Sequence, residues 1–178
     1  MQWQIDPAHT SLDFAVRHLG ISTVRGHFTK LSGTIDATDD GIITAIDITI
    51  DPTSVDTREP KRDDHLRSPD FLDVAQYPTL TFRSTKVTSK GKERFLVEGD
   101  LTLHGQTRPV RFEVEIASPI KDPWGNLRAA ATGEGKLNRK DWGLTYNQVL
   151  EFGALMVGDE VRFRLEAEAV AKTPVSVG

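Results

Sequence analysis

The stretch RDDHLRSPDFLD, residues 62–73, is the densest group of side chains that could do chemistry. Aspartate and histidine together can ligate a metal ion or transfer a proton. On a helix, however, consecutive residues point about 100° apart, so Asp63, Asp64 and His65 cannot all face one ion. Asp63 and Arg67 are four residues apart, a spacing suited to an ion pair. The spacing therefore predicts a charged helix surface rather than a metal site.

Other reactive side chains are scattered along the chain. There is no G-x-S-x-G motif for a serine nucleophile, no H-E-x-x-H motif for zinc, and no cysteine. The five histidines are far apart in the sequence. We therefore expect no catalytic residue, no bound metal and no other cofactor.

A few side chains could still contact a ligand. His18 continues the alternation of Phe14 and Val16, which leaves open a structural histidine or a ligand contact. The guanidinium groups of Arg17 and Arg67 would suit a diphosphate or a carbonyl, or could be solvated surface charges. Two tryptophans flank loops, where they could seal a pocket rim or bury in the core; they are Trp124 and Trp142.

The elements that would position these residues are strands, because apolar residues alternate with polar ones along most of the chain. Turn signals such as TDDG at 38–41 and HGQTRP at 104–109 separate the strands and favour antiparallel hairpins. A short extra strand is expected at 2–5. The eight main strands are expected near 11–18, 27–37, 42–51, 79–88, 93–104, 109–117, 128–137 and 160–171.

The alternation stops in residues 57–78, which we name the lid segment. Ser68 and Pro69 have the pattern of a helix N-cap and a first helical residue, so we expect two short helices here. The apolar side chains of this segment must bury against the core or a pocket mouth. They are Leu66, Phe71, Leu72 and Val74.

The fold class follows from the strand count. The chain has 178 residues, enough for one domain, which we place at 1–172 with a tail at 173–178. Eight antiparallel strands with one apolar face can close into an all-β barrel, filled by side chains or holding one small ligand. A two-sheet sandwich is the structural alternative.

Composition limits the partners and the location. A net charge of −4 argues against a nucleic-acid partner, and about eighteen consecutive apolar residues, enough to span a membrane, occur nowhere. The stretch MQWQIDPAHTSLDF lacks the pattern of a signal peptide, so we expect a cytoplasmic location.

Four segments together resemble the YceI-like family of polyisoprenoid-binding proteins. They are DPAHTSLDFAVRHLGISTVRGHF at 6–28, RDDHLRSPDFLDVAQYPTLTF at 62–82, GDLTLHGQTRPV at 99–110 and NRKDWGL at 138–144. The resemblance implies a lipocalin-like, eight-stranded antiparallel β-barrel whose apolar interior holds a long isoprenoid chain. Many members of that family carry an export signal, which this sequence does not show.

The function that we expect is non-enzymatic binding, to carry or store a polyprenyl phosphate or an isoprenoid quinone. Two alternatives remain: an enzyme acting on a lipid head group through His18 or His65, and a filled barrel that acts as an interaction module. A homodimer is possible. The residues expected at the ligand site are Phe14, Val16, Arg17, His18, Phe28, Arg67, Phe71, Leu72, Tyr77, Phe82, Leu101, Leu103, Phe112, Trp124, Trp142 and Phe163.

Overall fold

A computed structural model of the protein describes residues 1–172, in which twelve strands form one antiparallel sheet. The tail expected at 173–178 lies outside the described residues. The strands are β1 (Gln2–Ile5), β2 (Ser11–His18), β3 (Ser22–Phe28), β4 (Leu31–Ala37), β5 (Ile43–Ile50), β6 (Val55–Asp56), β7 (Leu80–Ser89), β8 (Arg94–Leu103), β9 (Gln106–Ile116), β10 (Ile120–Lys121), β11 (Leu127–Asn138) and β12 (Val157–Ala171). The helices are α1 (Pro60–Arg67) and the short 3-10 turns η1 (Pro7–His9), η2 (Pro52–Ser54), η3 (Arg139–Trp142) and η4 (Glu151–Gly153).

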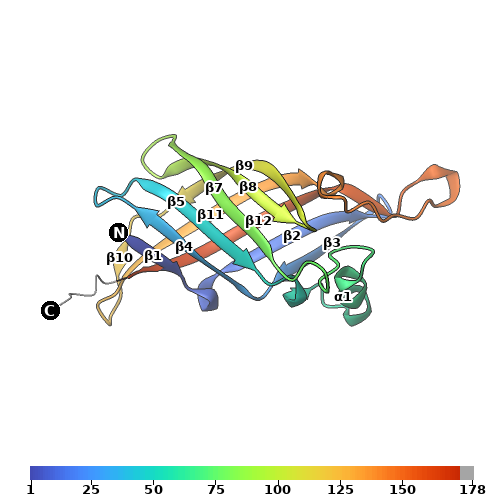
Figure 1. The fold of residues 1–178 in the computed structure, drawn as a ribbon, viewed down its shortest axis with the longest axis horizontal. Coiled ribbons are helices and arrows are strands. Elements are labelled where there is room, and N and C mark those ends of the chain that lie inside the picture. Colours follow the sequence, from blue (N-terminus) through green and yellow to red (C-terminus); the bar gives the residue numbers. More distant parts are fainter. Residues whose placement is uncertain (173–178) are drawn as a thin grey trace.

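Eight of these strands close into a barrel in the order β11-β9-β8-β7-β5-β4-β1-β12, as Figure 1 shows. The ring closes because β11 pairs with β12 over a long register, from Arg128 opposite Val170 to Asn138 opposite Glu160. The eight-stranded antiparallel barrel expected from the sequence is confirmed.

One edge of β12 is shared by two strands. β1 pairs with its carboxy-terminal end, where Ile5 lies opposite Ala169, and β2 pairs with its amino-terminal part, where Leu12 lies opposite Leu165. The short turn η1 separates β1 from β2, and its N-cap Asp6 accepts a hydrogen bond from the Ala8 amide. The short strand expected at 2–5 is β1.

The single strand expected at 27–37 is wrong, because the chain turns within it. β3 ends at Phe28 and pairs with β2, whereas β4 begins at Leu31 and pairs with β1 and β5. Phe28 and Leu31 are both buried although they lie three residues apart. One straight strand cannot place two such residues on the same face, because side chains alternate with a period of two.

The lid segment contains one helix rather than the expected two. The helix start predicted at Ser68 is wrong: α1 has Glu59 as N-cap and Pro60 at the first helical position, and Ser68 is its C-cap. The Ser68 amide donates to the His65 carbonyl at 3.1 Å, so Ser68 ends a helix rather than starting one. The residues that follow form turns, in which Asp73 has a φ of 47°. Glu59 and Pro60 carry the same helix-start pattern that Ser68 and Pro69 carry.

The ion pair expected between Asp63 and Arg67 is also wrong. Asp63 is buried, and its Oδ1 accepts hydrogen bonds from the Thr57 amide at 2.8 Å and the Thr57 hydroxyl at 2.6 Å. Arg67 instead contacts Asp64, 3.1 Å away. A buried carboxylate bonded to backbone and hydroxyl groups fixes the start of α1 more firmly than an exposed ion pair would.

The only α-helix within residues 1–172 is α1, which is too short and too polar to cross a bilayer. In Figure 1 it lies at one end of the elongated barrel, while the N-terminus and β10 lie at the other. We call these the lid end and the packed end.

Candidate functional site

The inward face of β12 changes character along its length. Val161, Phe163 and Leu165 point into the barrel but are only half-buried, whereas Ala167 and Ala169, further along the same face, are buried. A side chain that faces the interior and still keeps accessible surface must border an open space. The barrel is therefore hollow toward the lid end and filled toward the packed end.

The hollow half contains a cavity of about 310 Å³. Most of its wall comes from inward-facing positions of β2, β3, β5, β7, β8, β9 and β12, and the lid segment covers it with Leu66, Phe71 and Leu72. Ligand cavities in proteins typically measure about 300–1,000 Å³. This one is thus large enough for a small molecule or part of a longer chain.

The filled half gives the cavity a floor, formed by side chains from several strands. Trp3 and Ile43 are buried there with Val97, Val114 and Ala169, and none of these five lines the cavity. Large side chains of β1, β5, β8 and β9 are buried in this half together with the small alanines of β12, and such a mixture of sizes suits the inside of a narrow barrel.

Aromatic rings line the cavity without filling it, because they lie against glycines of the neighbouring strand. A Cβ atom built on Gly135 would lie only 2.7 Å from Cζ of Phe163, and one on Gly26 would lie 2.5 Å from Cζ of Phe14. Each phenylalanine is paired with its glycine across the ladder. The missing side chain lets the ring lie close to the wall and leaves the centre open.

The lid segment is tied to the barrel by hydrogen bonds at its start. Besides the bonds from Thr57 to Asp63, Arg62 donates from Nε to the Thr57 hydroxyl at 2.8 Å. Arg67 donates to the backbone carbonyls of Thr53 at 2.9 Å and Val55 at 3.0 Å. These bonds hold α1 against η2 and β6 across the barrel end.

An aromatic cluster joins the lid segment to the loop before β12. His65 and Phe71 from the lid segment and Tyr146 from the loop meet with all three pairs of ring centroids 5.0 Å apart. Nε2 of His65 lies 2.9 Å from Oδ2 of Asp70. His65 and Phe71 also line the cavity, so this contact borders its mouth.

The polar groups of the cavity lining are mostly basic side chains. Arg17, His18, Arg62 and His65 line it, with Asp13 as the one acidic side chain. The side chain of Arg17 is exposed and donates to the Gly20 carbonyl at 2.9 Å. The hollow half can therefore enclose an apolar chain and present positive or hydrogen-bonding groups to a polar end.

Arg139 also reaches the lining, but its guanidinium is buried and used internally. It donates to the carbonyls of Leu144, Tyr146 and Gly158 at 2.6, 2.9 and 2.9 Å. Burial lowers the pKa of Arg139 from its ordinary value, although a guanidinium stays charged at physiological pH. Arg139 thereby fixes the loop that carries Tyr146 to the start of β12.

Most of the residues expected at the ligand site do line this cavity. Four do not: Arg67, Tyr77, Trp124 and Trp142. The side chain of Arg67 is held by backbone carbonyls under the lid segment, and Tyr77 packs on His104 with ring centroids 4.9 Å apart. Trp142 is buried in the core, where its Nε1 donates to the Leu101 carbonyl at 3.0 Å.

Trp124 contradicts both interpretations that the sequence left open. It lies in the turn between β10 and β11, at the packed end, and is 82% exposed. It neither seals the mouth of the cavity nor packs in the core.

Sequence reasoning missed several lining residues. Leu80 shares the parity of Phe82 on β7, so extending the alternation by two positions would have found it. Met156 approaches the cavity from the loop before β12, where no periodic signal exists, and Val157 begins β12 three residues before the start expected at 160. The lining residues that were not in the expected set are Leu12, Asp13, Val24, Leu31, Ile48, Ile50, Val55, Arg62, His65, Leu66, Leu80, Val110, Leu137, Arg139, Leu144, Met156, Val157, Val161 and Leu165.

A second polar cluster lies outside the cavity, where Asp6, His9 and Glu168 come together. Their spacing could suit a metal ion, but the guanidinium of Arg128 lies 2.9 Å from Asp6 and 3.4 Å from Glu168. Arg128 also lies 2.9 Å from Asp122. A fixed cation already balances these carboxylates, so the cluster is better described as an ion-pair network.

This network strongly lowers the pKa of two carboxyl groups. Hydrogen bonds from His9 and Arg128 lower the pKa of Asp6 to about 2. Burial acts to raise the pKa of Asp122, but hydrogen bonds from Asn126 and Arg128 outweigh it and lower that pKa to about 2. Asp6 precedes η1 and Asp122 follows β10, so the network connects distant parts of the chain.

Comparisons with known proteins agree with this architecture. A family model for the YceI-like domain matches residues 3–169. A UPF0312 protein of Vibrio cholerae is 41% identical over 138 residues, which cover 77% of this chain and 73% of that one.

Two solved structures have the same fold. The YCEI protein of Campylobacter jejuni is 29% identical, with a TM-score of 0.76 over 88% of this chain and 90% of that chain. A polyisoprenoid binding domain from Saccharophagus degradans is 18% identical, with a TM-score of 0.70 over 96% of this chain and 98% of that chain. The matching family model, which spans nearly the whole barrel, shows that this chain belongs to the YceI-like family.

Proposed function

We propose that this protein binds a long-chain isoprenoid lipid, of the polyprenyl phosphate or isoprenoid quinone type, and carries or stores it unchanged. The observation that carries the proposal is the apolar cavity in the lid half of the barrel, walled by inward-facing side chains. The polyisoprenoid binding domain from Saccharophagus degradans, which shares the fold, supports this ligand class.

Burial of apolar surface drives the binding. Each methylene group moved from water into the cavity contributes about 0.8 kcal/mol. A branched isoprenoid chain matches a lining of phenylalanine, leucine and valine, which can contact it on all sides. The lid segment then shields the enclosed part of the chain from water.

The head group lies at the mouth, near Arg17, His18, Arg62 and His65. A phosphate or a quinone carbonyl would accept hydrogen bonds from these side chains, each contributing about 1.5–3 kcal/mol where the ligand is charged. Arg62 replaces Arg67 as the expected lid contact, because Arg62 lines the cavity and Arg67 does not.

Native mass spectrometry of the purified protein, followed by lipid extraction, tests the ligand class. We expect an added mass that corresponds to an isoprenoid chain. Protein that carries no lipid, and that fails to take up an added polyprenol or quinone, would contradict the proposal.

The head-group assignment has a separate test with a matched control. Arg17→Ala and Arg62→Ala should weaken the binding of a polyprenyl phosphate much more than that of the uncharged polyprenol. Arg25→Ala is the control, because Arg25 is exposed on β3 and does not line the cavity. Equal losses for both lipids, or the same loss in the control, would place the head group elsewhere.

One observation favours a second candidate, an enzyme that acts on the head group. His65 lines the cavity and lies 2.9 Å from Asp70, a pairing that could hold an imidazole as a general base. Incubation of the protein with a polyprenyl phosphate, followed by mass analysis of the lipid, tests this. Turnover that His65→Gln abolishes would support the enzyme; an unchanged lipid supports the carrier.

We also propose a cytoplasmic site of action, as expected from the sequence. Fractionation of cells that express the full-length gene with a carboxy-terminal tag would test it. Recovery of the tagged protein outside the cytoplasmic fraction would contradict it.

A further inference from the structure

Large apolar side chains are exposed on two segments at the lid end of the barrel. Ile21, in the turn between β2 and β3, is 80% exposed, and Val149, in the loop before β12, is 74% exposed. Leu19 and Leu155 belong to the same two segments and are also exposed. We name these four residues the apolar tip.

Backbone hydrogen bonds place the two segments side by side. The Leu19 amide donates to the Met156 carbonyl at 2.8 Å, and the Met156 amide donates to the Gln148 carbonyl at 3.0 Å. Val149 and Leu155 pair as an isolated antiparallel bridge. The apolar tip is therefore one feature, formed by a turn and a neighbouring hairpin.

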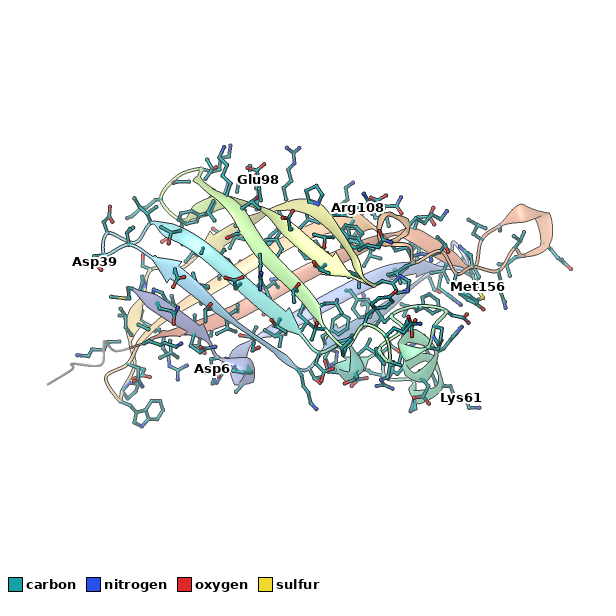
Figure 2. The ribbon with its side chains drawn as sticks, viewed as in Figure 1. Asp6, Asp39, Lys61, Glu98, Arg108 and Met156 are labelled. Carbon is teal, nitrogen blue, oxygen red and sulfur yellow. The ribbon has the colours of Figure 1, made fainter. Side chains whose placement is uncertain are left out.

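The hairpin is fixed at its base and projects from the barrel. Asn147 donates from Nδ2 to the Val157 carbonyl at 2.7 Å, and its Oδ1 accepts from the Val157 amide at 3.0 Å. Figure 1 shows this loop, in orange, extending beyond the strands along the long axis of the molecule. In Figure 2, Met156 at its base and Asp39 lie at opposite ends of the barrel.

The apolar tip is also poor in charge. Charged residues make up 27% of the chain, yet residues 144–157 contain a single one, Glu151. A projecting loop with exposed valine and leucine and a single charged side chain would lower its free energy by burying those apolar side chains in an apolar phase.

The tip is continuous with the cavity. His18 precedes Leu19, and Met156 and Val157 follow Leu155; all three of these neighbours line the cavity. The apolar path therefore runs from the exposed tip to the interior along the same two segments.

We propose that the apolar tip inserts into the surface of a lipid bilayer and so places the mouth of the cavity against the membrane. The interaction uses apolar side chains rather than charge, so it does not require anionic lipids. Its use for lipid exchange rests on the function proposed above, whereas the insertion itself does not.

The insertion can be measured at single positions, because the chain has no cysteine. Val149→Cys and, as the control, Ile120→Cys would be labelled with an environment-sensitive fluorophore and mixed with phosphatidylcholine vesicles that contain no isoprenoid. Ile120 is 67% exposed but belongs to β10, at the packed end. We expect a blue shift and a gain of intensity at position 149 and no change at position 120. A response at position 120, or none at position 149, would overturn the proposal.

Vesicle sedimentation gives the second test. Ile21→Ser combined with Val149→Ser and Leu155→Ser should lower vesicle binding by at least about tenfold, since each side chain loses its apolar burial. Ile42→Ser combined with Ile120→Ser should leave binding unchanged. Equal loss in both variants would refute the role of the tip. Wild-type binding should persist at about 0.5 M salt, where exposed charges are screened.

Three outcomes separate this inference from others. If the triple variant instead dissociates a dimer in analytical ultracentrifugation and binds vesicles normally, the tip is a self-association surface and the proposal fails. If the protein carries a lipid but does not bind vesicles, only the proposed membrane insertion is refuted. If it binds vesicles through the tip but carries no lipid, the insertion holds and the carrier function fails.

Discussion

Gly135→Ala should push the ring of Phe163 into the cavity. The new Cβ atom would lie 2.7 Å from Cζ and 3.0 Å from Cε1 of that ring. Carbon atoms in contact keep about 3.5–4.0 Å, so the ring tip must retreat by about 1 Å. Phe163 lines the cavity, so the ring has room to move inward.

Gly135→Ala should weaken ligand binding more than it lowers the free energy of unfolding. A ring displaced by this amount excludes the volume of one or two ligand methylenes, so the binding free energy weakens by about 0.8–1.6 kcal/mol, or about four- to fifteenfold. The displaced ring costs about 0.5–1.5 kcal/mol of stability. Alanine also restricts the unfolded chain more than glycine does, which stabilises the folded state by about 0.4–1 kcal/mol. The free energy of unfolding should thus change by less than about 1 kcal/mol.

Gly133→Ala is the matched control, because Gly133 lies two residues away on the same face of β11. A Cβ there would lie 3.3 Å from Cγ2 of Val114 and 3.5 Å from Cδ2 of Phe112, which is nearly ordinary contact. Titration of both variants with one polyprenol, read by fluorescence, gives the two affinities, and urea unfolding gives the two stabilities. Equal affinities, or a crystal structure of Gly135→Ala with Phe163 unmoved, would refute the reasoning.

Three further predictions concern the lid segment, acid stability and metals. Asp63→Ala leaves the Thr57 amide without its partner, so it should cost about 1–3 kcal/mol and speed hydrogen exchange mainly in residues 55–74; uniform exchange along the chain would argue against it. The pKa of Asp6 and that of Asp122 are lowered from 3.8 to about 2, so their stabilisation is complete above about pH 4 and is lost as the pH falls through 2. Urea unfolding between pH 2 and 5 should show this loss, and Asp6→Asn should reduce it; an unchanged pH dependence in that variant would contradict it. Adding EDTA should leave the unfolding curve and lipid binding unaltered, and a loss that zinc restores would show a metal site.

The barrel could be predicted because the inward face of a strand follows from the alternation of neighbouring residues in the sequence. Alternation along each strand identified the inward faces, and from them the cavity residues Phe14, Phe82, Phe112 and Phe163. The same rule failed between Phe28 and Leu31, where the parity slips by one residue and two strands were taken for one.

The rest depended on contacts between distant residues. Nothing near Trp124 in the sequence indicates that its turn lies at the packed end, because that depends on which strands close the ring. Arg67 and Asp63 could be assigned only once Thr53, Val55 and Thr57 were seen beneath the lid segment. The homodimer and the absence of a nucleic-acid partner stay predictions.

The filled half of the barrel has a consequence for ligand choice. Trp3, Ile43, Val97 and Val114 block the interior below the cavity, so a chain that enters at the lid end can advance only to that floor. The protein, and not the ligand, thereby sets the length of chain that is enclosed. Carbons beyond that depth stay outside and add little to the affinity. The affinity should therefore rise with chain length until the chain reaches the floor. Longer chains should all bind with similar affinity.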